Sequence, residues 1–240
     1  MTIRVIAIDG PAASGKSSTA ALVARRLGWA HLDSGALYRA VTLAVLDNLG
    51  DAAGEKDSGQ GSPQRIIALA EDLPVRLVLA DDEFRPEVAG VDVAEAIRSE
   101  RVTASVSGIA AIREVRHWVN VQQREAVMGH PRGVVVDGRD IGTVVFPDAP
   151  LKVYLTASPE ERARRRLLQR RGLGAPGGGI DPAELHRETE ALAARDRADA
   201  TRRVAPMKPA ADAHVLDTTG LTLHQQVDEV LALARERLPR

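Results

Sequence analysis

The chain of 240 residues contains no cysteine, which excludes disulfide bonds, thiolate metal sites and a thiol nucleophile. Aromatic residues make up only 2% of it, so its core must be built from aliphatic side chains. The formal net charge of −1 provides no overall field that would recruit nucleic acid or an anionic membrane. No apolar run is long enough to span a bilayer, and the first strand begins too early to leave room for a signal peptide. We therefore expect a cytoplasmic monomer without nucleic-acid or membrane partners.

The most informative segment follows directly on an apolar, β-branched run at residues 3–9. It reads GPAASGKSS and matches G-x-x-x-x-G-K-[ST] at Gly10, Gly15, Lys16 and Ser17, before a stretch with helical spacing. The amides of such a loop bind phosphate at a helix N-terminus, Lys16 adds a point charge, and the Ser17 hydroxyl can ligate Mg²⁺. The segment predicts a binding loop for the phosphates of ATP, formed by Gly10, Pro11, Ala12, Ala13, Ser14, Gly15, Lys16, Ser17 and Ser18.

Strand and helix signals alternate along the chain, which favours an α/β fold with a doubly wound parallel sheet. The strands are expected at residues 3–9, 30–32, 133–137, 151–155 and 213–216, and the last helix at 222–238. A polar, glycine-rich loop at residues 50–62 precedes two alternating segments, 75–79 and 84–88. These predict a small antiparallel excursion, which Pro86 should confine to a sheet edge.

Residues 158–203 interrupt the alternation a second time. Ser158, Pro159 and Glu161 form a capped helix start. The helix breaks at a glycine-rich stretch, 172–179, and resumes from Asp181 and Pro182. A helix–linker–helix insertion of this kind predicts a lid, and it carries 11 arginines against 8 acidic residues. Some of these pairs belong to a solvated helix face, but a lid over phosphoryl transfer also has to neutralise negative charge.

Two further motifs stand where ligands bind in open α/β sheets, at the carboxyl ends of strands. In HLDSGALYR, Asp33 or Ser34 caps a helix that carries Tyr38 and Arg39 one turn later. In DGRDIGTVVFPDAP, Asp137 ends an apolar strand, as does the carboxylate that organises Mg²⁺ through water in phosphate-loop enzymes. The following Gly138, Arg139 and Asp140 form a loop in which Arg139 suits a phosphate and Asp140 can accept from an exocyclic amine.

Together with RDRADATRRVAP at residues 195–206, these motifs make the whole chain resemble the bacterial cytidylate kinase family. The resemblance implies a phosphate-loop kinase core (1–33, 106–157 and 204–240), a nucleoside-monophosphate-binding insertion (34–105) and an arginine-rich lid (158–203). It implies that the base is held by Ser34, Arg116, Asp140 and Arg202, that the sugar faces Ser107, Arg195 and Asp199, and that the acceptor phosphate is gripped by Arg39, Arg139 and, more weakly, Arg98. It also makes Arg162, Arg165 and Arg166 the lid arginines, which act with Lys16 and Arg139 on the transferred phosphate.

The chain departs from the family pattern in two places. Arg113 stands where the family usually has a proline, three residues before Arg116, and this should leave Arg116 in place. The linker at 172–179 is longer and richer in glycine than usual, which bears on lid closure more than on chemistry.

The predicted reaction is ATP plus CMP or dCMP giving ADP plus CDP or dCDP, with Mg²⁺ as cofactor. The acceptor phosphate is already an anionic nucleophile, so no general base is required. A phosphate-loop kinase for another acceptor, such as shikimate or thymidylate, shares the loop but does not account for the DGRD and RDxxDxxR motifs. A GTPase switch would need Asn-Lys-x-Asp, which is absent. A nucleic-acid-binding NTPase is disfavoured by the near-zero net charge and the scarcity of aromatic stacking platforms.

Overall fold

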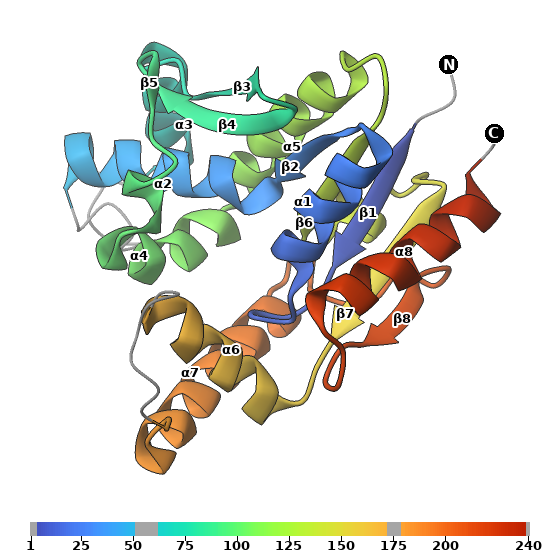
Figure 1. Cartoon of the computed structure of the whole chain (residues 1–240). Helices are drawn as coiled ribbons and strands as arrows, with labels where there is room; N and C mark the ends of the chain where they lie inside the picture. Colours follow the sequence, from blue (N-terminus) through green and yellow to red (C-terminus); the bar gives the residue numbers. More distant parts are fainter. Residues whose placement is uncertain (1–3, 51–61, 172–178, 239–240) are drawn as a thin grey trace. The chain divides into compact units, whose positions relative to one another are not determined.

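The computed structural model describes residues 4–50, 62–171 and 179–238. The chain forms two compact units, one of Met1–Arg4 with Ala24–Asp137 and one of Val5–Val23 with Gly138–Arg240. Both combine parallel strands with helices, so the predicted α/β fold with a mostly parallel sheet is confirmed (Figure 1). No helix in the described ranges has the length and apolar character needed to cross a bilayer.

The second unit contains the first, seventh and eighth strands, which run parallel in the order β1-β7-β8. They are β1 (Val5–Asp9), β7 (Leu151–Thr156) and β8 (His214–Asp217), and every residue of β1 is buried. Helix α8 (Leu223–Arg237) packs against β7, and a capping box of Thr222 and Gln225 starts it. The chain leaves β1 through the glycine-rich loop into α1 (Lys16–Leu27), as the motif predicts.

Two helices of this unit, α6 (Pro159–Arg171) and α7 (Pro182–Thr201), pack against each other (Figure 1). The predicted caps are present: the amide of Glu161 donates to Ser158 Oγ at 3.3 Å, and Asp181 accepts from Ala183. The predicted helix starts at 159 and 182 are therefore confirmed. The expected glycine-rich break at 172–179 falls mostly on residues 172–178, which lie outside the described ranges.

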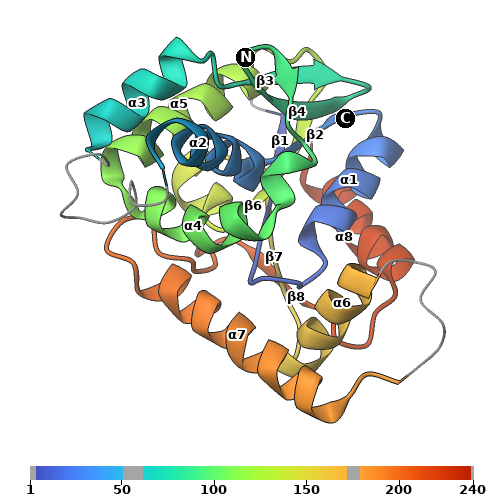
Figure 2. The same ribbon diagram turned by 90° about the vertical axis from the view of Figure 1, so that its left-hand side faces the viewer.

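The first unit contains β2 (Ala30–Asp33) and β6 (Val134–Gly138), which pair in parallel with Asp33 opposite Asp137. Helix α2 (Ser34–Leu49) is packed by α3 (Pro63–Asp72), α4 (Glu100–Ala111) and α5 (Arg113–Met128), which surround it in Figure 2. A 3-10 turn, Ala96–Arg98, precedes α4. The shared core is almost entirely aliphatic, as the shortage of aromatics requires.

Arg113 is the first residue of α5, at the position where proline is favoured because its fixed φ suits a helix start. Arginine is also a good helix former, and the amide of Arg116 still bonds the carbonyl of Ile112 at 3.0 Å. The replacement therefore leaves Arg116 within the first turns of the helix.

The antiparallel excursion in this unit is confirmed, since β3 (Arg76–Ala80) pairs with β4 (Glu83–Val88). The prediction that Pro86 confines it to a sheet edge is wrong, because β4 lies between β3 and β2. The strand meets β2 only at Glu83 and the short β5 (Val91–Asp92) only at Glu87 and Val88. Pro86 falls between these two contacts, so its missing N–H interrupts no ladder on that side.

Candidate active site

The loop after β1 is held in a shape that only glycine accommodates at its two ends. Gly10 has φ +153°, and a Cβ there would lie 2.2 Å from the carbonyl oxygen of Leu155. Gly15 has φ +94°, and its Cβ would lie 2.7 Å from Oε1 of Gln226 on α8. Between them, Ala13 adopts a positive φ of 57°. The backbone therefore closes into the tight turn that a phosphate-binding loop requires.

The reactive side chains of the loop lie at the start of α1. Lys16 Nζ donates to the carbonyl of Pro11 at 3.1 Å, so the cation folds back across the loop. Ser14 is fully buried, and its Oγ has no hydrogen-bond partner among the described residues. An orphaned hydroxyl inside a loop of this shape fits a site made for an oxygen-rich anion.

An ion pair between helices α6 and α7 contacts the loop. The carboxylate of Asp196 accepts the amide of Ala12 at 3.1 Å through Oδ1 and pairs with Arg162 through Oδ2. Arg162 also donates to the carbonyl of Ala12 at 3.1 Å and is buried. The predicted lid thus touches the phosphate-binding loop directly.

The other two predicted lid arginines differ in their surroundings. Arg165 donates to Ser14 O at 3.4 Å and to Thr218 Oγ1 at 3.0 Å, while Glu161 holds its Nε at 2.8 Å. Arg166 is half-buried on α6 and donates to Gln169 Oε1 at 3.0 Å. Arg165 is therefore placed at the loop.

Arg139 connects the DGRDIGTVVFPDAP motif to the glycine-rich loop after β1. Its guanidinium donates to the carbonyl of Gly10 at 2.6 Å and pairs with Asp199 at 3.0 Å. Desolvation lowers the pKa of Arg139, and nearby Arg195 lowers it further, while Asp199 opposes the shift. The Nε of Arg195 is buried without a hydrogen-bond partner among the described residues. Two neighbouring guanidinium groups of this kind suit a phosphate.

Asp140 and Arg202, both predicted to hold the base, are brought together. Their side chains approach to 3.3 Å, and Arg202 also lies 3.6 Å from Asp199. Asp140 is 5% exposed, so its carboxylate is shielded from bulk water. A buried, oriented carboxylate can discriminate an amino group from a carbonyl oxygen.

The remaining predicted acceptor-binding residues belong to the first unit. Ser34 is buried at the start of α2, which Asp33 caps by accepting from the Gly35 amide at 2.9 Å. The guanidinium of Arg116 lies 5.2 Å from the centre of the Tyr38 ring, and the Tyr38 hydroxyl donates to Asn120 at 3.2 Å. The structure therefore groups Tyr38 and Arg116 in one polar cluster.

The phosphate candidates of this unit are less closely grouped. Arg39 donates to the carbonyl of Ile97 at 3.1 Å and to Thr103 Oγ1 at 2.9 Å. Arg98 is exposed at the end of the 3-10 turn, and Ser107 is exposed on α4.

Asp137, the predicted Mg²⁺-organising carboxylate, is almost fully buried at the end of β6. Its Oδ1 lies 2.8 Å from Nε2 of His31, also buried. Burial lowers the pKa of His31, but the hydrogen bond and charge of Asp137 outweigh it and raise the pKa overall. Among the described residues, no cluster of three or more acidic or histidine side chains could hold a metal alone. Carboxylate and hydroxyl oxygens are ligand types that suit Mg²⁺, which takes its remaining ligands from phosphates and water.

Three polar residues near the motifs escape the sequence reasoning. Asp9 accepts from the amides of Ile141 and Gly142, and Asp196 links α7 to Ala12. Gln123 on α5 donates to the carbonyl of Ser34 at 2.9 Å. Its spacing from Arg116, two helical turns along one face, is the one signal in the sequence that could have found it.

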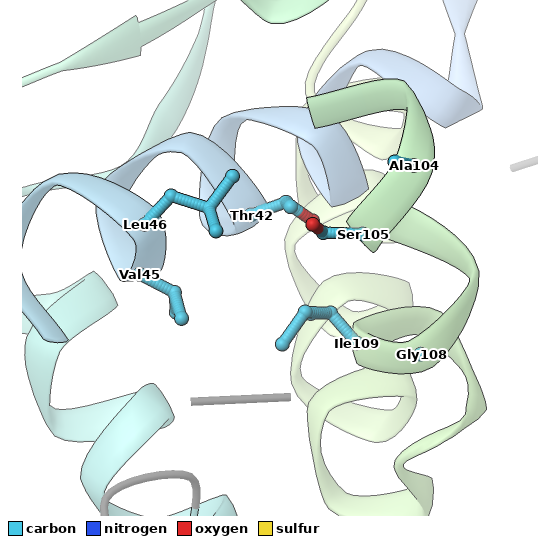
Figure 3. A pocket seen from close by; sticks show the side chains of 7 residues that line it. All are labelled: Thr42, Val45, Leu46, Ala104, Ser105, Gly108 and Ile109. Carbon is cyan, nitrogen blue, oxygen red and sulfur yellow. The ribbon is translucent and has the colours of Figure 1, made fainter. Parts of the chain in front are cut away.

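A cavity of about 210 Å³ in the first unit lies apart from the predicted residues. It is formed where α2 faces α4, and mainly aliphatic and small side chains line it (Figure 3). None of the predicted site residues lines it.

The tight loop, the lysine at a helix start and the arginine-rich helix pair define the class of the protein, a phosphate-loop kinase. The family model for cytidylate kinase matches residues 6–236. The cytidylate kinase of Desulfitobacterium hafniense is 46% identical, covering 97% of this chain and 93% of its own. That of Pseudomonas paraeruginosa is 43% identical, covering 95% and 94%. Among solved structures, TT1252 from Thermus thermophilus aligns over the full length of both chains at 19% identity and a TM-score of 0.49.

The chain belongs to the cytidylate kinase family.

Proposed function

We propose that the chain transfers the γ-phosphoryl group of ATP to the phosphate of CMP or dCMP, releasing ADP and CDP or dCDP. One observation carries the proposal: Arg139, next to Asp140, donates a hydrogen bond to the Gly10 carbonyl of the loop proposed to bind ATP. The residues proposed to bind acceptor phosphate and base therefore share an anchor with the loop proposed to hold the donor. Family membership and the named cytidylate kinases support the same acceptor.

In the proposed reaction, an acceptor phosphate oxygen attacks the γ-phosphorus, and the bond to the β,γ-bridging oxygen breaks. The acceptor is anionic, so positioning and charge neutralisation provide the catalysis. Lys16 and Arg139 would neutralise the transferred phosphate, with Arg162, Arg165 and Arg166 contributed by the lid. Ser17 and, through water, Asp137 would hold Mg²⁺, which supplies charge neutralisation between the phosphates.

Selection of the base would rest on Asp140. Its carboxylate accepts a hydrogen bond from the amino group of cytosine, whereas the O4 of uracil would meet it acceptor to acceptor. Arg202 fixes the carboxylate at 3.3 Å, and Ser34 and Arg116 complete the base site. Asp199 and Arg195 would face the sugar with Ser107, while Arg39 and Arg98 would reach the acceptor phosphate beside Tyr38 and Gly138.

The same proposal assigns residues 34–105 to acceptor binding and 158–203 to a lid over a core of 1–33, 106–157 and 204–240. The contacts of Arg162 and Arg165 with the loop support the lid assignment. Absence of cysteine fits the reducing cytoplasm, where we place the enzyme as a monomer.

The test is release of ADP from ATP and Mg²⁺ with CMP, dCMP, UMP, dTMP and AMP as separate acceptors, with the diphosphate product identified. CMP and dCMP should be the fastest acceptors. Turnover confined to AMP or dTMP, or ADP release without a nucleoside diphosphate product, would refute the proposal.

A further inference from the structure

The DGRDIGTVVFPDAP motif contains an unusual helical start. Asp140 occupies the N-cap position of a π-helical turn, Ile141–Val145, and its carbonyl accepts from the amides of Val144 and Val145. An aspartate at this position normally turns its carboxylate onto the first free amides of its own helix. The side chain of Asp140 makes no such capping bond.

Those free amides are satisfied from the neighbouring strand instead. Asp9 ends β1, and its two carboxylate oxygens accept from Ile141 N and Gly142 N, each at 2.8 Å. Asp9 is 5% exposed, and a Cβ at Gly142 would be in ordinary contact with its Oδ2, at 3.4 Å. The carboxylate of Asp9, on another element of the fold, thus caps the π-helical turn in place of the N-cap residue Asp140.

We propose that Asp9 is a positioning residue for base selection: by capping the turn in place of Asp140, it leaves the Asp140 carboxylate to the base and to Arg202. The inference rests on the proposed function, in which Asp140 reads the amino group of cytosine. It adds a residue of the ATP-loop strand to the selectivity of the acceptor site.

Burial opposes the ionised form of Asp9, because desolvation raises the pKa of its carboxyl group to about 6. The protein nevertheless has an ionisable group at this buried position. Backbone bonds from Gly142 and Ile141 and the charge of Lys16 work against that shift, while the charge of Asp140 adds to it. Groups that are retained against such a cost are concentrated at functional sites.

The discriminating substitution is Asp9→Asn. Its amide oxygen can accept from one of the two backbone N–H groups, but its NH₂ must then face the other as donor to donor. Asp140 should turn back to cap the freed amide, because an unsatisfied buried N–H is costly. The preference for CMP over UMP, taken as the ratio of kcat/KM values, should fall by roughly tenfold, while the KM for ATP changes little.

A double-mutant cycle separates this inference from the function on which it rests. Asp140→Ala alone should lower the CMP/UMP ratio at least tenfold. Asp9→Asn added to Asp140→Ala should lower it no further, because Asp9 acts through Asp140. Asp92→Asn is the matched control: it also accepts a backbone amide, from Ala94, but on the exposed hairpin of the first unit, and should leave the ratio unchanged.

Each outcome decides a different point. If Asp140→Ala leaves the ratio unchanged, the base-reading role of Asp140 fails, and the route proposed for Asp9 fails with it. If Asp140→Ala lowers the ratio but Asp9→Asn does not, or lowers CMP and UMP turnover equally, the function stands and the inference is overturned. Should Asp9→Asn not fold, Asp9→Glu, whose longer side chain cannot keep one carboxylate oxygen on each of the two amides, must lower the ratio for the inference to survive.

Discussion

Replacing Asp9 by asparagine should also change how the stability of the protein depends on pH. The carboxyl is buried, and desolvation raises its pKa from 3.8 to about 6. Acidification therefore affects stability in the opposite direction from that of a salt-bridged aspartate. Above pH 6 the ionised Asp9 destabilises the folded state, and its protonation at lower pH removes this destabilisation.

The magnitude follows from the shift. Near pH 7.5, both states are ionised, and a pKa raised from 3.8 to about 6 corresponds to about 3 kcal/mol of lost folding free energy. Near pH 5, the folded state is largely protonated while the unfolded state is not, and the same relation leaves about half of that loss. Between these conditions, wild type should therefore gain on the order of 1 kcal/mol relative to Asp9→Asn.

In the asparagine variant one backbone amide loses the Asp9 carboxylate, and this loss, together with the turn of Asp140 that caps the amide instead, costs about 1–3 kcal/mol at either pH. At pH 7.5 this offsets much of the relief, so the two proteins should have similar stability there. The decisive quantity is thus the change of the difference with pH, and not the difference itself.

The assay is urea unfolding of the ligand-free proteins near pH 7.5 and pH 5, followed by far-UV circular dichroism. Asp92→Asn, at an exposed backbone-capping carboxylate, controls for a general Asp-to-Asn effect and should run parallel to wild type. A difference between wild type and Asp9→Asn that is the same at both pH values would refute the reasoning, because it would mean that the buried carboxyl has an ordinary pKa.

Four other substitutions test the site. Lys16→Ala should leave a folded protein but lower kcat by about 10²–10³-fold, as for one preorganised donor; near-normal turnover of the pure variant would contradict the loop assignment. Asp140→Ala should reduce the CMP/UMP preference at least tenfold while ATP binding, followed by fluorescence titration, stays within about twofold. Gly15→Ala, at φ +94° and with its Cβ 2.7 Å from Gln226, should weaken ATP binding by more than tenfold, and unchanged affinity would show that the loop can relax. Asp196→Asn should speed amide hydrogen exchange in α6 of the free protein, because Arg162 and the Ala12 amide lose their shared carboxylate; Glu190→Gln, exposed on α7, is the control, and equal exchange in both variants would show that the pair does not hold the helices.

The parts of the fold that follow local rules could be predicted from the sequence. Alternating β-branched runs, capping residues and the GPAASGKSS motif locate the strands, the start of α6 at Pro159 and the turn into α1. These features depend on neighbours within a few residues, so a linear pattern contains them. Pro86 shows the limit of such patterns. Its missing N–H predicts an edge strand, but the neighbours of β4 on that side pair with it only before and after Pro86, and only the register reveals that β4 is an inner strand.

The site shows the same division. Lys16 and Arg139 stand in sequence motifs and Arg162 in an arginine-rich helix, whereas the acceptors that hold Arg139 and Arg162 follow no such pattern. Gly10 offers its carbonyl to Arg139, 129 residues away, and Asp196 holds Arg162 and the Ala12 amide together. Neither partner has a chemical signature of its own, since one is a backbone oxygen and the other an aspartate in a charged helix.

Asp9 is a further residue whose contacts could not be predicted from the sequence. In the sequence it is the polar end of an apolar strand, and an acid before a glycine-rich loop reads equally well as a turn residue. In the structure, its neighbour Gly10 bonds Arg139 while Asp9 itself bonds the two residues after Asp140. The end of β1 therefore holds, on both sides, the segment that contains the proposed acceptor-binding side chains of Arg139 and Asp140. A displacement of the ATP loop would then move Arg139 and Asp140 together. In the proposed reaction, donor and acceptor would then share their alignment through one buried strand end, and the double-mutant cycle of Asp9 and Asp140 tests this link directly.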